Sequence, residues 1–337
     1  MKAIGYREAG SIDREDALIA FEAERPKATG HDLLVKVQAV SVNPVDCKIR
    51  TNRPPTGDEP AILGWDAVGE VVEAGDNATR FNPGDTVWYA GAINRPGTNC
   101  EFHLVDERIV GRAPNSISAT AAAALPLTTL TAYEMLFDRL RVDDPVPGAA
   151  PSVLIIGGAG GVGTIAIQLL RAKMDVQVIA TASRDETKQW VRDLGAHHVL
   201  DHSQPLAAQI EALGIGAPGY VFSTTHTHQY LEEIAELIAP QGRFGLIDDP
   251  DGLDVRLFKQ KSVSTHWEFM YTRSLFSTTD IARQSDILNE VAELIDAGAI
   301  RSTATQSLGV LSVENLRKAH ILIESGKAKG KLVLEGF

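Results

Sequence analysis

Cysteine is scarce in this sequence, which has only Cys47 and Cys100 among its 337 residues. Two isolated thiols supply neither the ligand spacing of a metal site nor a disulfide framework, and this usage is typical of a reducing cytoplasm. Long hydrophobic runs are also lacking. No segment approaches the roughly 20 apolar residues that cross a bilayer, and Met1–Tyr6 contains no apolar signal core. We therefore expect a soluble cytoplasmic protein with no membrane partner.

Positive charge is in deficit as well. The chain has 32 lysine and arginine residues against 44 aspartate and glutamate residues, which gives a net charge of -12 at pH 7. A protein of this charge repels a phosphate polymer, so we expect no nucleic-acid partner. Hydrophobic residues are plentiful at 44%, and together with the length they predict two domains with substantial cores.

A cluster of glycines follows an apolar run in the middle of the chain. Val153–Ile156 is typical of a strand buried in a parallel sheet, Thr164–Lys173 has the apolar spacing of a helix, and Val176–Ala180 follows as a second strand. Glycines between a strand and a helix fit the dinucleotide fingerprint, in which the backbone approaches a pyrophosphate at a helix amino end. An ordinary tight turn is the alternative, and the strand–helix–strand context argues against it. The predicted nucleotide-binding turn comprises Gly158, Ala159, Gly160, Gly161, Val162 and Gly163.

Two patterns divide the rest of the chain. Up to about Val110, short strands alternate with turns, and Leu33–Val40 has the period of two of a half-buried strand, which favours a small β-barrel. After an alanine-rich helix near Ser118, strands and helices alternate as in a doubly wound parallel sheet. The further elements predicted for that sheet are strands at His198–Leu200, Tyr220–Ser223, Arg243–Ile247 and near Val263–Met270, and helices around Leu206–Leu213 and Tyr230–Ile238. The predicted tail consists of helices around Ile281–Ala297 and Glu314–Ser325 and a strand at Lys331–Leu334.

Four short segments resemble signatures of the medium-chain dehydrogenase/reductase superfamily. They are Ser41–Asp46, Leu63–Gly69, Gly84–Val87 and Gly326–Leu334, and the resemblance covers essentially the whole chain. Within the superfamily, the sequence resembles the quinone oxidoreductase (ζ-crystallin) branch, and specifically bacterial proteins labelled zinc-type alcohol dehydrogenase-like. The resemblance implies an α/β protein with a GroES-like β-barrel catalytic domain, residues 1–127 and 270–337, and a Rossmann domain with a doubly wound parallel sheet, residues 128–269. It also implies a homodimer.

The zinc ligands of that superfamily are missing. Zinc members have a cysteine, a histidine and a third ligand where this chain has Asn43, Trp65 and the segment Leu125–Thr131, and only Asp66 remains as a ligand candidate. A catalytic zinc needs about three protein ligands of N, S or O type and one open position. We therefore predict no metal site, and a zinc-dependent alcohol dehydrogenase is the alternative function.

The segment that follows the second strand of the sheet predicts the cofactor. NAD enzymes place an acid there to accept from the ribose 2′-OH, whereas this chain has Ser183 and Arg184, with Lys188 one helical turn further on. A hydroxyl and two cations suit a 2′-phosphate, so we predict NADPH. The alternative is that Arg184 is an ordinary solvated surface charge. His202 and Thr224 complete the predicted cofactor contacts.

The missing zinc also bears on the substrate. Without a Lewis acid to stabilise an alkoxide, an alcohol and a ketone are difficult to interconvert. Hydride addition to a quinone or an α,β-unsaturated carbonyl requires less stabilisation of negative charge, because that charge spreads over a conjugated system. We therefore predict NADPH-dependent reduction of a small-molecule quinone or enone. An NADPH-binding structural or sensor protein is the alternative of another class, because a fold alone does not establish catalysis.

The resemblance also suggests catalytic residues. It places Asn43 near the nicotinamide and the substrate, and Thr131 near the carboxamide. Lys48 is a candidate donor of a hydrogen bond or a proton, and an ordinary surface lysine is the alternative. Trp65, Trp267 and Phe269 are candidates for an aromatic pocket, although the last two alternate as core residues on one strand face would.

Overall fold

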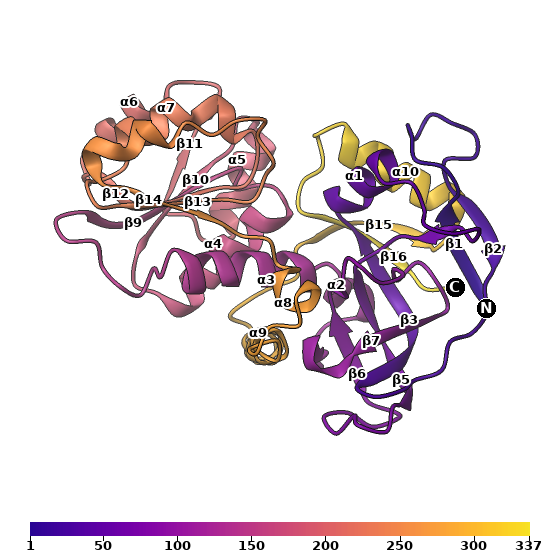
Figure 1. The fold of residues 1–337 in the computed structure, drawn as a ribbon. Helices are drawn as coiled ribbons and strands as arrows, with labels where there is room; N and C mark the ends of the chain where they lie inside the picture. Colours follow the sequence, from indigo (N-terminus) through magenta and orange to yellow (C-terminus); the bar gives the residue numbers. More distant parts are fainter. The chain divides into compact units, whose positions relative to one another are not determined.

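The computed structural model describes residues 1–337, and the chain divides into two compact units (Figure 1). The first unit joins Met1–Leu130 to Tyr271–Phe337, and the second is Thr131–Met270. The chain leaves the first unit within helix α3 (Pro126–Tyr133) and returns to it only after the second unit is complete. None of the helices combines the length and the apolar character that a bilayer crossing demands.

The first unit is built mainly on antiparallel strands. Its seven-stranded sheet has the order β15-β16-β3-β5-β6-β8, with β7 paired to β3, and only β15 and β16 pair in parallel. A separate three-stranded sheet has the order β2-β1-β4. The strands are β1 (Lys2–Tyr6), β2 (Ile19–Glu22), β3 (Asp32–Val42), β4 (Ala61–Ile62), β5 (Asp66–Ala74), β6 (Thr86–Tyr89), β7 (Phe102–Asp106), β8 (Val110–Arg112), β15 (Ala304–Val310) and β16 (Lys331–Glu335). The other helices of this unit are α1 (Pro44–Asn52), α2 (Ala119–Ala123), α8 (Thr272–Leu275), α9 (Arg283–Asp296), α10 (Val313–Glu324) and the 3-10 helix η1 (Glu107–Ile109).

Strand β3 pairs with three other strands of this sheet. Leu33, Leu34 and Val35 are all inaccessible to solvent, and only further along do exposed Lys36 and Gln38 alternate with buried neighbours. The expectation of a half-buried strand is therefore wrong for the first part of β3. The physical reason is that β5 and β7 pair with both edges of that part, and helix α2 also packs against the strand.

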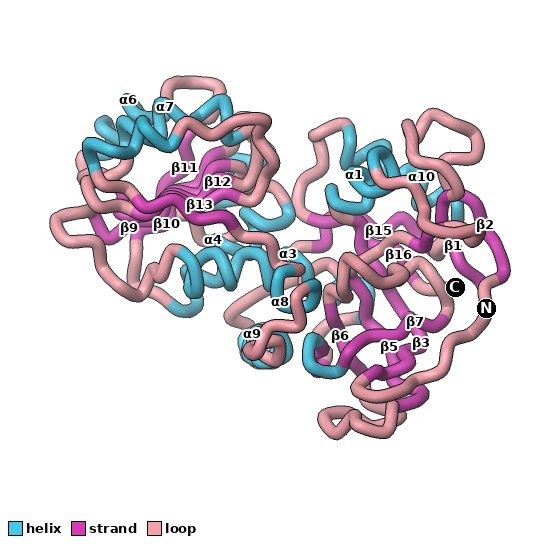
Figure 2. Tube along the Cα trace, in the orientation of Figure 1, coloured by secondary structure: helices cyan, strands magenta, loops and turns pink.

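The second unit is a doubly wound parallel sheet, as predicted. Its strands have the order β11-β10-β9-β12-β13-β14, and all pairings are parallel. Helices α6 and α7 cover one face of this sheet and α4 lies on the other (Figure 2). The strands are β9 (Ala150–Ile156), β10 (Gln177–Thr181), β11 (His198–Leu200), β12 (Pro218–Ser223), β13 (Arg243–Leu246) and β14 (Ser264–Trp267). The helices are α4 (Gly161–Lys173), α5 (Asp185–Asp193), α6 (Leu206–Leu213), α7 (Thr227–Leu237), the π-helix η2 (Glu134–Arg139) and the 3-10 helix η3 (Val255–Lys261).

Apolar side chains of the strands and of α6 and α7 form one continuous core in this unit. Strand residues Leu154, Val221 and Phe244 are inaccessible to solvent, and Leu206 of α6 and Ile234 of α7 join the same cluster. Each such side chain contributes about 1.5–3 kcal/mol when it leaves water, so the sheet is a stiff scaffold. That scaffold holds the carboxyl ends of the strands, and the loops that follow them, in fixed positions.

Candidate functional site

The glycine cluster forms the turn between β9 and α4. Gly160 precedes the helix as its cap residue, with φ −75° and ψ 173°. A Cβ atom on Gly163 would lie 2.4 Å from the carbonyl oxygen of Gly157, and one on Gly158 would lie 2.8 Å from the Cβ atom of Ala180. Strand and helix therefore meet with no room for a side chain at either position. Since the cap residue has no side chain, the free N–H groups of the first helical turn are open to a phosphate.

Side chains from two neighbouring strands lie beside this turn. The hydroxyl of Thr181 accepts from the backbone N–H of Gly157 at 3.0 Å and lies 3.1 Å from Nδ1 of His202. The hydroxyl of Thr224 donates to the carbonyl oxygen of Ile156 at 2.9 Å. The structure thus brings the predicted His202 and Thr224 to the same edge of the sheet as Gly158, Ala159, Gly160, Gly161, Val162 and Gly163. The sequence analysis did not predict that Thr181 lies at this site. The feature that could have indicated it is a polar residue at the end of a buried strand.

The loop between β10 and α5 contains the residues predicted to read the 2′-phosphate. Ser183 is half-buried, and exposed Arg184 is the cap residue that precedes α5. Lys188 on the first turns of that helix forms an ion pair with Asp201, with Nζ 2.7 Å from Oδ2. The hydrogen bond from Lys188 holds the pKa of Asp201 below its usual range. The counter-charge of Lys188 was not predicted, although Asp201 directly follows strand β11.

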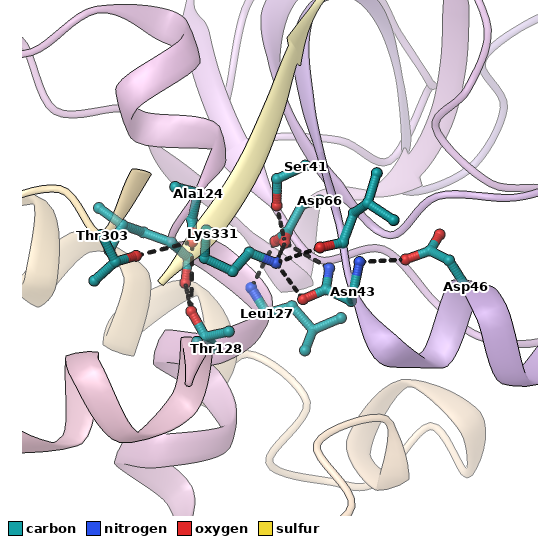
Figure 3. A network of polar contacts seen from close by, with 12 residues as sticks. Ser41, Asn43, Asp46, Asp66, Ala124, Leu127, Thr128, Thr303 and Lys331 are labelled. Atoms are coloured by element: carbon teal, nitrogen blue, oxygen red, sulfur yellow. Dashed lines mark hydrogen bonds and ion pairs between the residues drawn. The ribbon is translucent and has the colours of Figure 1, made fainter. Parts of the chain in front are cut away.

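A buried polar network surrounds the carboxylate of Asp66 in the first unit (Figure 3). Its Oδ2 atom accepts from Oγ of Ser41 at 2.7 Å, from Nδ2 of Asn43 at 2.7 Å and from Nζ of Lys331 at 3.2 Å. Its Oδ1 atom accepts from the backbone N–H of Leu127 at 2.7 Å. The carboxylate therefore links β3, β5 and β16 to the first turn of α3, where an anion also meets the positive end of the helix dipole.

Lys331 is the cation of this network and is 3% exposed. Its ammonium group donates to Asp66, to the carbonyl oxygen of Val42 at 3.0 Å and to Oδ1 of Asn43. An ammonium group has three N–H donors, so each one has an acceptor here. Burial lowers the pKa of Lys331, and the carboxylate of Asp66 opposes this effect. The sequence analysis did not include this residue among the site residues. The feature that could have indicated it is a lysine at the start of an otherwise apolar closing strand.

Asp46 is a second buried carboxyl group beside the network. Its Oδ2 atom accepts from the backbone N–H of Asn43 at 2.7 Å, at the start of helix α1. Burial raises the pKa of Asp46 to about 7, and the charge of Asp66 acts in the same direction. Asp46 therefore takes up a proton near neutral pH, whereas an exposed aspartate does so at about 3.9.

The donor set around Asp66 does not fit a zinc ion. Asn43, at the cysteine position, is hydrogen-bonded to Asp66 and Lys331. Trp65, at the histidine position, donates from Nε1 to the carbonyl oxygen of Ala92 at 3.2 Å. No group of three or more His, Cys, Asp or Glu side chains in the chain is arranged to hold a metal ion. About three such ligands are needed for a tetrahedral site, and both oxygens of Asp66 already accept hydrogen bonds.

Trp65 lies in the wall of a pocket of about 800 Å³ in the first unit. The indole is 3% exposed and meets the ring of Tyr271 edge-on, with ring centroids 6.4 Å apart. Other side chains that line the pocket are mostly apolar and include Tyr6, Ile49, Ile62, Leu63 and Ile93. Trp65 thus borders a space of the size that small-molecule ligands occupy, about 300–1,000 Å³.

The other predicted catalytic residues belong to both units. Lys48 lies on the exposed side of α1, and Thr131 is buried within α3. Trp267, at the end of β14, is 52% exposed and donates from Nε1 to the carbonyl oxygen of Asp248 at 3.1 Å. Phe269 is 46% exposed. The interpretation of Trp267 and Phe269 as core residues is therefore wrong: Trp267 ends β14, the last strand of its sheet, and Phe269 follows that strand.

Known proteins match the chain along nearly its whole length. Two family models match, the alcohol dehydrogenase GroES-like domain at residues 29–122 and the zinc-binding dehydrogenase model at residues 194–334. A zinc-type alcohol dehydrogenase-like protein of Staphylococcus aureus is 40% identical over 99% of both chains. A human mitochondrial NAD(P)H oxidoreductase is 31% identical over 90% of this chain and 81% of its own.

Solved structures share the fold. A Rhizobium etli protein, whose name assigns it to the zinc-dependent alcohol dehydrogenases, is 57% identical and superposes with a TM-score of 0.99 over 100% of this chain and 98% of its own. An Escherichia coli quinone oxidoreductase solved with NADPH is 23% identical, with a TM-score of 0.82 over 99% of this chain and 100% of its own. At that identity the likeness shows the fold alone.

Proposed function

The chain belongs to the medium-chain dehydrogenase/reductase superfamily of oxidoreductases, and from this premise we propose that it transfers a hydride from NADPH to a quinone or an α,β-unsaturated carbonyl compound without catalytic zinc. The network around Asp66 is the observation that carries the proposal. Asn43 and Trp65 replace the expected ligands, and Lys331 supplies the positive charge beside Asp66. An alcohol substrate would need a Lewis acid at this point, whereas a conjugated carbonyl acceptor does not.

The glycine turn supports the cofactor part of the proposal. The N–H groups at the start of α4 would hold the pyrophosphate, and Gly158 and Gly163 let the backbone approach it. Ser183 and Arg184 at the start of α5 would hold the 2′-phosphate of the adenosine ribose. NADPH supplies the hydride when it is bound. The Escherichia coli quinone oxidoreductase of the same fold, which was solved with NADPH, agrees with this choice.

The pocket beside Trp65 supports an apolar substrate. Its volume of about 800 Å³ can hold the body of a quinone or an enone, and its lining is mostly apolar, although Arg53, Glu59 and Arg95 also line it.

NADPH oxidation in the presence of a panel of quinones and enones tests the proposal. We expect turnover of several conjugated acceptors and none of simple primary alcohols with NADP⁺. Binding of NADPH without turnover of any acceptor would favour a structural or sensor protein. Turnover of alcohols that depends on one tightly held zinc ion per chain would instead support a zinc-dependent alcohol dehydrogenase.

A further inference from the structure

The pocket beside Trp65 is larger than the reacting part of a conjugated acceptor requires. Its volume is about 800 Å³. A benzoquinone ring with its two oxygens takes on the order of 240 Å³, even if each non-hydrogen atom is given the roughly 30 Å³ of a water molecule. Most of the pocket is therefore left for the rest of the substrate.

The buried side chains of the lining that contain polar atoms already have hydrogen-bond partners in the protein. The hydroxyl of Tyr6 donates to the carbonyl oxygen of Arg53 at 2.7 Å. The indole N–H of Trp65 donates to the carbonyl oxygen of Ala92 at 3.2 Å. Neither side chain therefore needs a polar partner on a ligand.

The same holds for the other two buried side chains of this kind. The thiol of Cys100 donates to the carbonyl oxygen of Phe102 at 3.1 Å. His103 has both ring nitrogens occupied, with Nδ1 3.2 Å from the hydroxyl of Tyr89 and Nε2 2.9 Å from the carbonyl oxygen of Pro96. Burial lowers the pKa of His103 to about 4, so the ring is neutral at neutral pH. A neutral imidazole has one donor and one acceptor, and both are used here.

The charged side chains of the lining are paired or exposed to solvent. Arg95 is half-buried and forms two hydrogen bonds with the carboxylate of Asp32, at 2.8 and 2.9 Å. The exposed ones are Glu22, Glu24, Arg53 and Glu59. The buried part of the pocket therefore offers a ligand apolar contacts and no unpaired charge.

We infer that this pocket binds a large hydrocarbon substituent of the substrate, so that the preferred acceptors are quinones or enones with a long apolar side chain. The inference rests on the proposed function, in which the pocket beside Trp65 holds the substrate. Each CH₂ group that moves from water into an apolar pocket strengthens binding by up to about fourfold. A charged substituent would lose its hydration there and find no partner among the buried side chains.

A homologous series of unbranched enals, from 2-pentenal to 2-decenal, tests the inference. We expect kcat/KM to rise roughly two- to fourfold with each added CH₂ group. The change should lie mainly in KM, because the side chain makes the same contacts before and during hydride transfer. Equal kcat/KM values along the whole series would overturn the inference.

Substitution of Ala61 tests whether this pocket holds the side chain. Ala61 lines the pocket and is half-buried on β4, at the edge of the three-stranded sheet. Ala61→Phe fills space that several CH₂ groups would occupy, so the ratio of kcat/KM for 2-decenal to that for 2-pentenal should fall roughly tenfold or more. Ala61→Leu adds less volume and should lower the ratio less. Ala74→Phe is the matched control, because Ala74 is exposed at the end of β5 and outside the pocket, and it should keep the wild-type ratio.

A second measurement does not depend on turnover. Calorimetric titration with the saturated ketones 2-hexanone, 2-octanone and 2-decanone measures binding alone, and Kd should fall roughly two- to fourfold per CH₂ group in the wild type and in Ala74→Phe. Folded Ala61→Phe and Ala61→Leu variants with the wild-type dependence on chain length, in both measurements, would overturn the inference. A wild type that binds the ketones in this order but reduces no conjugated acceptor would support the role of the pocket and overturn the proposed function instead.

Discussion

Nζ of Lys188 lies 2.7 Å from Oδ2 of Asp201, and this ion pair joins helix α5 to the residue that follows strand β11. The two side chains are 24% and 26% exposed, so the pair is partly shielded from solvent. The charge of Lys188 therefore already has a counter-ion in the protein. In the proposed function, Arg184, the cap residue of the same helix, is the other cation that would bind the 2′-phosphate.

Replacement of Arg184 tests the cofactor assignment. A charge-assisted contact with the 2′-phosphate contributes about 1.5–3 kcal/mol, and NADH has no such phosphate. Arg184→Ala should therefore weaken NADPH binding roughly ten- to hundredfold and leave NADH binding almost unchanged. Titration of both cofactors by isothermal calorimetry measures this difference. Lys188→Ala should cost less NADPH affinity than Arg184→Ala, because Asp201 already offsets its charge. Equal losses of affinity for the two cofactors, or a wild type that prefers NADH, would show that this loop does not bind the 2′-phosphate.

Gly163→Ala should disrupt the glycine turn. Its Cβ atom would lie 2.4 Å from the carbonyl oxygen of Gly157, so β9 and α4 would have to move apart. We expect the free energy of unfolding to fall by about 1–3 kcal/mol, in the range of overpacked cores, together with loss of NADPH binding. Urea denaturation and cofactor titration measure the two effects. Gly252→Ala is the control, because a Cβ atom there meets nothing within 4 Å. A Gly163→Ala variant as stable as Gly252→Ala, with wild-type affinity, would contradict the close approach.

Chelation should leave the activity unchanged. The donors around Asp66 are engaged with one another, and the proposed reaction needs no cation to polarise its substrate. The measurement is the rate of NADPH oxidation with one quinone before and after prolonged dialysis against a strong chelator. Activity that disappears on dialysis and returns with added zinc would show that the proposal without metal is wrong.

The stability of the protein should depend on pH through Asp46. Its pKa is raised to about 7 in the folded protein, against about 3.9 in an unfolded chain, so the folded state holds the proton more tightly. This group therefore makes stability fall as the pH rises from about 4 to about 7, by at most about 1.4 kcal/mol per pH unit. Asp46→Asn should remove that fall. The free energy of unfolding of the variant should therefore rise relative to that of the wild type as the pH rises through this window.

Urea denaturation at several pH values measures the difference between Asp46→Asn and wild type. Asp76→Asn, at an exposed position in the loop after β5, is the control. Its free energy of unfolding should differ from that of the wild type by the same amount at every pH. A constant difference for Asp46→Asn as well would show that the carboxyl group is charged throughout.

Most of the second unit could be predicted from sequence because local patterns determine it. Continuous apolar runs predicted the buried parallel strands, and strand β11 and helix α6 occupy the residues that the sequence predicted for them. The first unit was less predictable. The burial of Leu33 and Leu34 depends on β5 and β7, whose pairing with β3 cannot be read from the period of β3 itself. The π-helical turn Glu134–Arg139 also lacks a distinct periodic signal, because one extra residue per turn alters the pattern only slightly.

The candidate site divides in the same way. The glycine turn could be predicted because its residues are contiguous and each follows from the geometry of one turn. The network around Asp66 could not, because Ser41, Asp66, Leu127 and Lys331 come from segments far apart in the sequence. The exposure of Trp267 depends on its place in the last strand of a sheet, which is a property of strand order and not of composition.

The late position of Lys331 in the chain also bears on how the protein is made. Its strand, β16, pairs with β3 at Ala39–Val42, so that edge of β3 stays unpaired until residues 332–335 have left the ribosome. Residues 131–270 form contacts mainly among themselves and can fold while the first unit is still incomplete. The ammonium group that holds Asn43 thus reaches its place among the last contacts to form. Closure of the first unit and completion of the candidate site are then a single late event in biogenesis, and a nascent chain stalled before β16 would display an open strand edge to the quality-control machinery.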